Sequence, residues 1–150
     1  MWLEVNCIVI SMKKLTHILL AAFMFITGGM IYLFFRSDTL ILFRWCRLLR
    51  LDNLVNSMRE SQVANLELPN WIVFNLPDGL WLLAYLLVVD VVWGFRLSCQ
   101  SVLWLSVLPV VAIGSEVLQH FNIVIGTFDP LDLISYSLSV IVFKIKKMWI

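Results

Sequence analysis

The chain has 150 residues, of which 61% are apolar and only 14% are charged, and its formal net charge is +1. Soluble domains are about 45–50% apolar and about 25% charged, so a water-soluble fold of this length could not bury so much apolar surface. The same numbers argue against a disordered chain, which is poor in apolar residues, and against a nucleic-acid-binding protein, which is strongly basic. The composition predicts a single membrane domain over residues 1–150.

The first long apolar stretch predicts a transmembrane helix over residues 17–35. The stretch contains no Asp, Glu, Lys or Arg, and at 1.5 Å per residue it nearly crosses a hydrocarbon core about 30 Å thick. Lys13 and Lys14 precede it, as in a signal peptide, but the apolar run continues too far for a cleaved signal, which favours an uncleaved anchor. Met12 is an alternative start of the chain, with residues 1–11 as an extension.

Segment 38–60 is more polar and shows helical periodicity. Apolar residues recur there at steps of three or four positions, and arginines form a second stripe. This pattern is typical of an amphipathic helix that lies in the headgroup plane, and the alternative is a soluble helix packed on the bundle. The apolar stripe consists of Ile41, Trp45, Leu48, Leu51, Val55 and Met58, and the basic stripe of Arg44, Arg47 and Arg50.

Three further apolar stretches predict transmembrane helices over residues 79–96, 101–119 and 131–149. Pro109 lies inside the second of these and should kink that helix. Residues 120–130 are too few and too mixed to cross a membrane, so they are predicted to form a re-entrant or surface loop. The predicted fold class is therefore all-α: a polytopic membrane helical bundle of about four transmembrane helices plus an amphipathic interfacial helix.

The basic residues indicate the orientation of this bundle. If the N-terminus lies inside, six basic residues are cytoplasmic and five arginines of the first long loop are outside, a weak bias under the positive-inside rule. The prediction is a multi-pass protein of the bacterial inner membrane with both termini in the cytoplasm. The six cytoplasmic residues are Lys13, Lys14, Arg96, Lys144, Lys146 and Lys147.

One carboxylate, Asp90, lies in the middle of the second predicted span, where an unpaired charge is expensive. It is expected to be protonated or to face a polar partner inside the bundle. Two interpretations remain open: a functional intramembrane group, or a structural one that is hydrogen-bonded to Gln100, Ser101 or Ser106.

A second group of polar residues lies at the ends of the last two spans. Glu116, Gln119 and His120 share one helix face, while Asp129 and Asp132 open the last helix, the first as an N-cap ahead of a proline. If the last two helices are antiparallel, these side chains meet in one outward-facing pocket. Such a set suits a cation, an amine-bearing ligand or general acid–base work.

Other chemistry is not indicated by the sequence. Ligands for a metal are too few, no cofactor is expected, and none of the common nucleophile, phosphate-binding or zinc-protease motifs is present. The sequence therefore gives no catalytic residue, and it leaves open whether the protein is an enzyme.

Two motifs in the second half of the chain resemble the VanZ-like family, which is named for a teicoplanin-resistance protein. Gly114-Ser115-Glu116-Val117-Leu118-Gln119 matches a Glu-x-x-Gln near a helix end, and Asp132, in the stretch from Gly126 to Leu133, matches an Asp that opens the last helix. The resemblance covers residues 77–143.

A third motif and three departures complete this resemblance. Asp78 and Tyr85 match the outer positions of an Asp…His…Tyr pattern, although no His lies between them. Thr127 and Tyr136 stand where the family has Arg and Asn. The resemblance implies a compact inner-membrane protein with a link to cell-envelope processes or glycopeptide tolerance.

Three functions are compatible with these patterns. The first is binding of an envelope lipid or an antibiotic-related ligand in the polar pocket between the last two helices, with membrane lipids as partners. The second is a non-catalytic subunit that docks on another membrane protein through segment 38–60. The third is a small proton-coupled transporter in which Asp90 relays protons.

Overall fold

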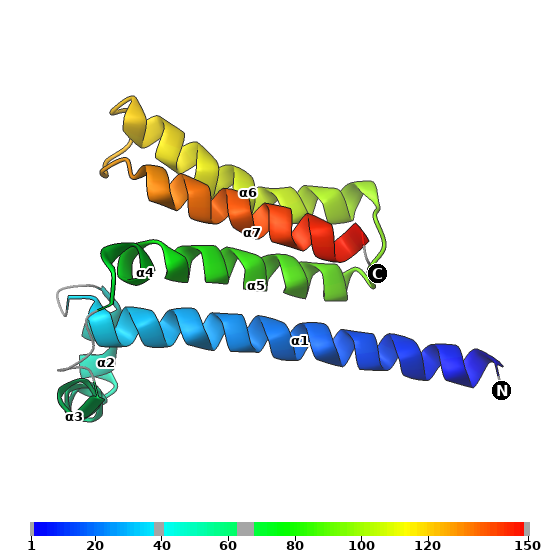
Figure 1. The fold of residues 1–150 in the computed structure, drawn as a ribbon, viewed down its shortest axis with the longest axis horizontal. Coiled ribbons are helices and arrows are strands. Elements are labelled where there is room, and N and C mark those ends of the chain that lie inside the picture. Colours follow the sequence, from blue (N-terminus) through cyan, green and yellow to red (C-terminus); the bar gives the residue numbers. More distant parts are fainter. Residues whose placement is uncertain (1, 38–40, 63–67, 149–150) are drawn as a thin grey trace.

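The computed structural model describes residues 2–37, 41–62 and 68–148, and these residues form helices joined by turns, which confirms the all-α class. Four long helices lie side by side, and three short ones are gathered at one end (Figure 1). In chain order the helices are α1 (Trp2–Phe35), α2 (Ile41–Leu48), α3 (Asp52–Gln62), α4 (Asn70–Phe74), α5 (Leu76–Val92), α6 (Cys99–His120) and α7 (Pro130–Met148).

Helix α5 is the centre of the bundle. It lies between α1 on one side and α6 and α7 on the other (Figure 1). Leu82, Leu86 and Leu87 of α5 are at most 2% exposed, and Ala21 of α1 and Phe143 of α7 pack against them. The near-continuous apolar sequence of α5 agrees with this position, because a helix that packs on three neighbours needs apolar residues on most of its surface.

Two helices are long and apolar enough to cross a membrane. They are Ile10–Phe35, with 26 residues and a mean hydropathy of 2.3, and Cys99–His120, with 22 residues and a mean hydropathy of 1.9. The core helix of a soluble protein can have this composition too, but such a helix is mostly buried. Only 11% and 17% of the most apolar segments of these two helices are buried. Most of their apolar side chains therefore face outward, as they would toward lipid.

The other two predicted spans differ from these helices, because α5 is shorter and α7 carries several charges at its end. Helix α5 has 17 residues, and α7 has 19 with three lysines among its last five. Helix α5 ends at Val92 rather than at residue 96, because Gly94 and Phe95 have φ angles of 59° and 64°, a left-handed conformation that an α-helix cannot contain.

Helix α1 begins well before residue 17, where the sequence predicted the first span to start. Two polar side chains stay helical there by bonding the preceding turn: the Thr16 hydroxyl donates to the Met12 carbonyl at 2.9 Å, and His17 Nδ1 lies 2.9 Å from the Lys13 carbonyl oxygen. Such local bonds satisfy polar groups on an apolar helix without breaking it.

Segment 38–60 forms two helices rather than the single one predicted. Helix α2 ends where Arg50 adopts a left-handed φ of 57°, with its N–H bonded to the Arg47 carbonyl at 3.1 Å. Asp52 then opens α3, where its charge favours the N-terminus of a new helix. The periodicity continued across this break and therefore concealed it; residues 38–40 lie outside the described part of the chain.

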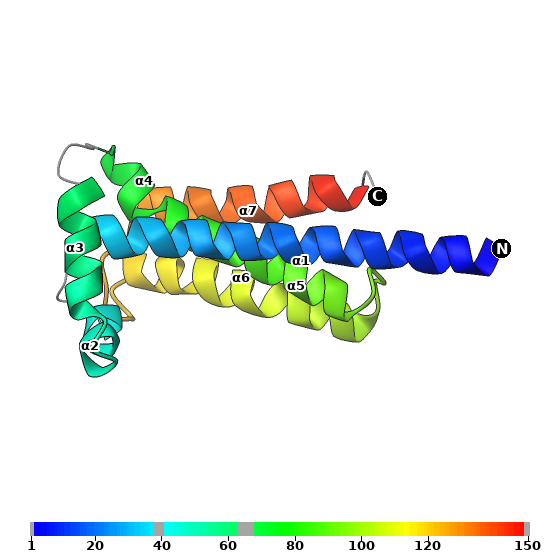
Figure 2. The same cartoon turned by 90° about the horizontal axis from the view of Figure 1, so that it is seen from below.

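Helices α2 and α3 run across the axis of α1 at its C-terminal end (Figure 2). Phe43 and Val55 are about 5% exposed, and Arg59 Nη2 donates to the Arg36 carbonyl at 2.7 Å, so one face packs on the bundle. Trp45 and Leu48 are 58% and 81% exposed. The two helices thus combine the alternatives considered for this segment: they pack on the bundle and still present apolar side chains outward.

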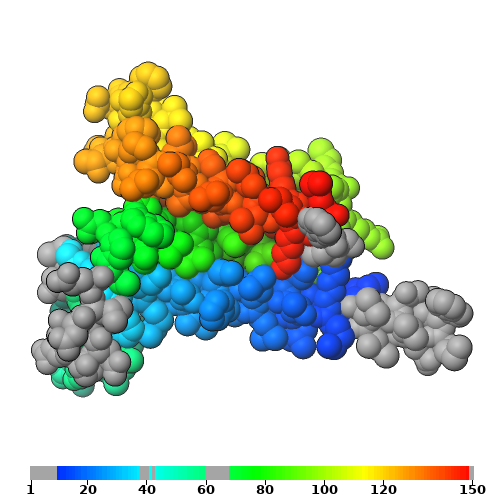
Figure 3. Space-filling view, viewed as in Figure 1, coloured from blue at the N-terminus to red at the C-terminus, as the bar shows by residue number. Residues whose placement is uncertain are grey.

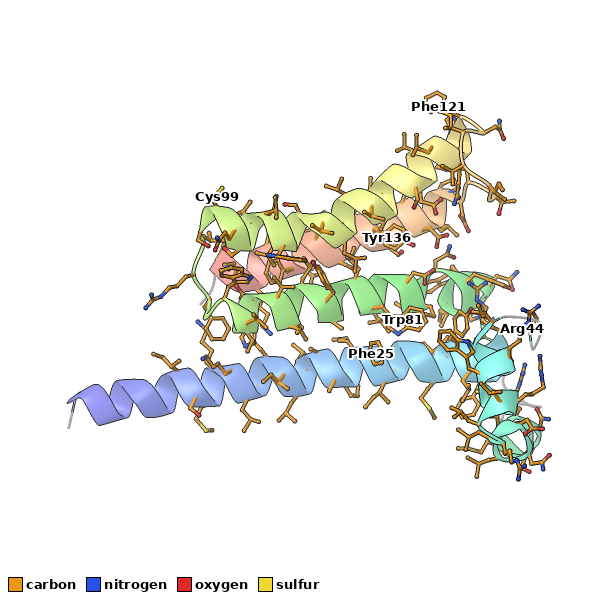
Figure 4. All side chains as sticks on the ribbon, turned by 180° about the vertical axis from the view of Figure 1, so that it is seen from behind. Phe25, Arg44, Trp81, Cys99, Phe121 and Tyr136 are labelled. Atoms are coloured by element: carbon orange, nitrogen blue, oxygen red, sulfur yellow. The ribbon has the colours of Figure 1, made fainter. Side chains whose placement is uncertain are left out.

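Helix α6 begins with a capping box and bends in its middle. Ser98 and Ser101 exchange side-chain and backbone hydrogen bonds at 3.1 and 2.7 Å, which satisfies two free N–H groups at the helix start. Pro109 lies inside the helix, and the half of α6 that follows it turns away from α5 (Figure 4). The predicted kink is present, because proline removes one backbone hydrogen bond and clashes with the preceding turn.

Small residues allow two pairs of helices to approach closely, as in many membrane bundles. A Cβ at Gly28 of α1 would lie 2.8 Å from Nε1 of Trp81 in α5. Trp81 in turn donates to the Phe25 carbonyl at 3.2 Å (Figure 4). Between α5 and α7, the Ser139 hydroxyl donates to the carbonyl of Gly79 at 2.7 Å. These contacts set the positions of α1 and α7 against the central helix.

Candidate functional site

Four carboxylates gather at the end of the bundle that also carries α4. They come from three separate parts of the chain: the first turn of α5, the end of α6, and the start of α7 with the residue before it. Together with one amide they form what we call the acidic cluster. Its members are Asn75, Asp78, Glu116, Asp129 and Asp132.

Asn75 connects two carboxylates of the acidic cluster through hydrogen bonds. Its Nδ2 donates to Oδ2 of Asp129 at 2.9 Å and to Oδ1 of Asp132 at 2.8 Å. Asn75 lies at the junction of α4 and α5 and is only 4% exposed, so the short helix α4 serves to bring this amide over the start of α7. Both amide protons are used, which leaves the two carboxylates oriented by one rigid donor.

Glu116 and Asp129 connect α6 to α7 at the same place. Glu116 is 6% exposed, and its Oε2 accepts the backbone N–H of Asp129 at 3.2 Å. Asp129 Oδ1 accepts the N–H of Leu131 at 2.9 Å, so Asp129 caps α7 as the sequence predicted. The antiparallel arrangement of α6 and α7 follows from the same contacts (Figure 1).

Asp78 lies in the first turn of α5, ahead of the residues expected to cross the membrane. The pKa of Asp78 is raised to about 6, mainly by burial and also by the nearby carboxylates of Asp132 and Glu116, while Arg36 acts in the opposite direction. Its carboxyl group thus changes charge close to neutral pH, and a bound cation would favour the charged form.

Two residues that the sequence assigned to the polar pocket, Gln119 and His120, and one that the family resemblance added as a candidate, Tyr85, lie elsewhere. His120 is exposed, and its ring contacts the Phe128 ring edge-on with 4.8 Å between centroids. The Gln119 side chain packs against Gly126 in the loop that follows α6. The Tyr85 hydroxyl donates to the Trp104 carbonyl of α6 at 2.5 Å, about two helical turns from the cluster. Sharing a helix face with a site residue did not suffice, because Gln119 and His120 contact the loop that follows α6 and Tyr85 contacts α6 itself.

The structure also places residues at the cluster that the sequence analysis did not assign to it. Asn75 lies three positions before Asp78, and Tyr136 lies four after Asp132, so each shares a helix face with a predicted residue. The charges of Asp78, Asp132 and Glu116 all act on the Tyr136 side chain, which points along α7 in Figure 4. The spacing could have identified Tyr136, whereas the role of Asn75 depends on its tertiary contacts with Asp129 and Asp132.

An apolar groove adjoins the cluster. It has a volume of about 220 Å³ and runs between α5 and α7 from Trp71 and Asn75 toward Leu83 and Val142. The only other polar side chains in its walls are serines, and the hydroxyl of one of them, Ser139, is bonded to backbone carbonyls. A ligand with a cationic head group and an apolar chain would find carboxylates for its head group and an apolar groove for its chain.

The loop after α6, residues 121–129, projects from the body of the bundle (Figure 3). Phe121 and Ile123 are about two-thirds exposed, and Ile125 is fully exposed. The segment thus forms a loop, as the sequence predicted, with apolar side chains exposed at its tip. Its exposed apolar tip lies at the same end of the bundle as the acidic cluster.

Asp90 lies at the opposite end of the bundle from this cluster. Because α5 ends at Val92, Asp90 is in its last turn and not at mid-span, and it forms an ion pair with Lys147 of α7. The proposed partners are engaged elsewhere: the hydroxyls of Ser101 and Ser106 donate to backbone carbonyls. This pairing favours a structural role for Asp90 over a proton relay.

Within the part of the chain that the structure describes, no three His, Cys, Asp or Glu side chains are arranged to hold a metal ion. Comparison of the chain with protein-family models, curated protein sequences and solved structures finds no match. The acidic cluster and the groove beside it therefore carry the functional argument alone.

Proposed function

We propose that the chain is a VanZ-like integral membrane protein that binds an amine-bearing envelope lipid, or an antibiotic-related ligand with the same amine, at the acidic cluster. The observation that carries this proposal is the position of Asn75. This buried amide bonds both Asp129 and Asp132, and it also lines one end of an apolar groove. An ammonium group offers three donors to such carboxylates, and the groove suits an acyl chain.

The crowding of carboxylates supports a cationic partner. Glu116 and Asp132 are both close enough to act on Asp78 electrostatically, and like charges in a partly buried site repel each other. Among the residues that the structure describes, Arg36 is the cation that acts on Asp78 against them, and its guanidinium also stacks 4.8 Å from the Phe74 ring centroid. A bound ammonium would remove the remaining repulsion, which is the source of affinity that we propose.

We further propose that all four long helices cross a bacterial inner membrane. Helices α5 and α7 lie beside α1 and α6, and the chain termini lie at the same end of the bundle (Figure 1). Lysines at the end of α7 can extend to the headgroups, which lets a short helix span. With basic residues inside, both termini are cytoplasmic and the acidic cluster faces outward.

Removal of one carboxylate charge tests the site. We expect Asp132→Asn and Glu116→Gln each to weaken binding of phosphatidylethanolamine about tenfold, since a hydrogen bond to a charged group contributes about 1.5 kcal/mol or more. Binding is measured by native mass spectrometry of the detergent-purified protein. Asp52→Asn, in α3 and outside the cluster, is the matched control; unchanged binding in both cluster variants would refute the proposal.

The pH dependence of binding gives a second test. Since the pKa of Asp78 is raised to about 6, this carboxyl group is mostly neutral at pH 5 and mostly charged at pH 7. The lipid amine stays protonated over this range, so its affinity should increase about tenfold from pH 5 to pH 7. In Asp78→Asn the increase should disappear, and a variant that keeps the full increase would show that another group is responsible.

A second function, docking on another membrane protein, is favoured by the exposed apolar side chains of α2. Ile41, Trp45 and Leu48 are more than half exposed. If this surface binds a partner protein beside the basic stripe, neutralising Arg44, Arg47 and Arg50 to Gln should reduce co-purification of that partner several-fold. A purified chain that is monomeric and without a stoichiometric partner, before and after the change, would exclude docking through this segment.

A further inference from the structure

A second and larger groove lies between α5, α6 and α7, away from the acidic cluster. Its volume is about 630 Å³, and Leu86, Leu105, Pro109, Val140 and Phe143 form much of its wall. Because α6 bends at Pro109, its two halves do not both pack closely on α5 and α7 (Figure 4). The groove lies along the half of α6 that precedes the bend and ends at the bend, because its α6 residues run from Val102 to Val110.

Apart from two lysines at one end, the walls of this groove are apolar. The one hydroxyl in the lining, on Ser106, donates to the Val102 carbonyl at 2.7 Å. A polypeptide segment laid here would find no polar partner along the wall for its own side chains. A hydrocarbon chain needs none, so the wall matches an acyl chain.

One end of the groove is basic. Lys144 and Lys147 contribute to the lining, and Lys147 is paired with Asp90, whereas Lys144 is exposed. Lys146 and Arg96 belong to the same end of the bundle, where Asp90 is the only described acidic residue of α5. The net charge at this mouth is therefore positive, which is complementary to a phosphate.

We propose that this groove is a binding site for an anionic phospholipid, whose phosphate contacts Lys144 and one of whose acyl chains lies along α6 and α7 toward Pro109. Basic pockets between transmembrane helices on the cytoplasmic side commonly bind anionic headgroups. The site is separate from the acidic cluster, since it lies at the other end of the bundle and has the opposite charge. It would hold α6 in its bent position against the other helices.

Native mass spectrometry of the full chain with phosphatidylglycerol or phosphatidylcholine tests this site. Phosphatidylglycerol should bind at least fivefold more tightly than phosphatidylcholine, and Lys144→Ala should remove about fivefold of that affinity, the effect of one lysine near a lipid surface. Lys14→Ala is the matched control, because Lys14 is an exposed lysine of α1 outside the groove.

A variant that fills the groove without changing its charge tests whether lipid binding needs the open groove as well as the lysine. Val110→Trp places a ring in the groove without changing any charge, and it should lower phosphatidylglycerol affinity at least as much as Lys144→Ala does. Equal binding of both lipids, an equal loss in Lys14→Ala, or unchanged binding in Val110→Trp would each overturn the proposal. So would a stable dimer that Val110→Trp dissociates, since a second copy would then be the occupant.

Discussion

Replacement of Lys147 by methionine is expected to lower the free energy of unfolding by about 3 kcal/mol. Lys147 pairs with Asp90, whose side chain is 6% exposed, so the substitution leaves a buried carboxylate without its cation. Removal of one partner of a buried ion pair costs about 3–5 kcal/mol, because the remaining charge is neither hydrated nor compensated. The measurement is unfolding of the detergent-solubilised protein, followed by circular dichroism.

Replacement of the other partner, Asp90, provides the control, because the two side chains of the ion pair differ in exposure. The Lys147 side chain is 20% exposed, so in Asp90→Leu the freed ammonium can turn toward water or headgroups. We expect Asp90→Leu to cost clearly less than Lys147→Met, and the double variant to recover most of the loss. If Lys147→Met were neutral while Asp90→Leu abolished a transport activity, Asp90 would be a functional group and not a structural one.

The positions of the long helices could be predicted from the sequence because hydropathy acts over many residues at once. The predicted spans 101–119 and 131–149 differ from α6 and α7 by at most two residues at each end. The end of α5 could not be predicted in this way. It depends on Gly94 and Phe95 in left-handed conformations, and Phe95 is a residue whose side chain disfavours that conformation.

The apolar periodicity of segment 38–60 also failed to predict that a helix ends near Arg50. Arg50 ends α2 with a positive φ, a position at which glycine or asparagine would have indicated the break. The apolar pattern continued through it because each helix buries an apolar residue, Phe43 in α2 and Val55 in α3. Since α2 packs on α3 and α3 packs on α1, two short helices here look like one longer amphipathic helix.

The acidic cluster was predictable in part. Glu116, Asp129 and Asp132 are brought together by the antiparallel pairing of α6 and α7, which the sequence suggested. Asn75 was missed because its role arises from tertiary structure: α4 and α5 place it over α7, more than 50 positions away in the chain. The structure places His120 outside the cluster, where its ring contacts the Phe128 ring of the following loop.

The second large effect is expected from Gly79→Leu, which should lower the free energy of unfolding by about 2 kcal/mol and abolish binding at the acidic cluster. A Cβ at Gly79 would lie 3.2 Å from the Ser135 carbonyl oxygen, a backbone atom that cannot move without displacing α7. Overpacking of a close helix contact typically costs about 1–3 kcal/mol. Displacement of α7 would also separate Asn75 from Asp132, whose hydrogen bond of 2.8 Å spans the same interface.

Gly114→Leu is the matched control for this effect. Gly114 is also a helical glycine, in α6, but a Cβ there would meet no atom within 4 Å. Since leucine favours helix over glycine by about 0.8 kcal/mol, this variant should be neutral or slightly more stable. Phosphatidylethanolamine binding and thermal unfolding are measured for both variants. Equal stability of the two would mean that α5 and α7 do not pack through Gly79, and the position of the acidic cluster would then lose its structural basis.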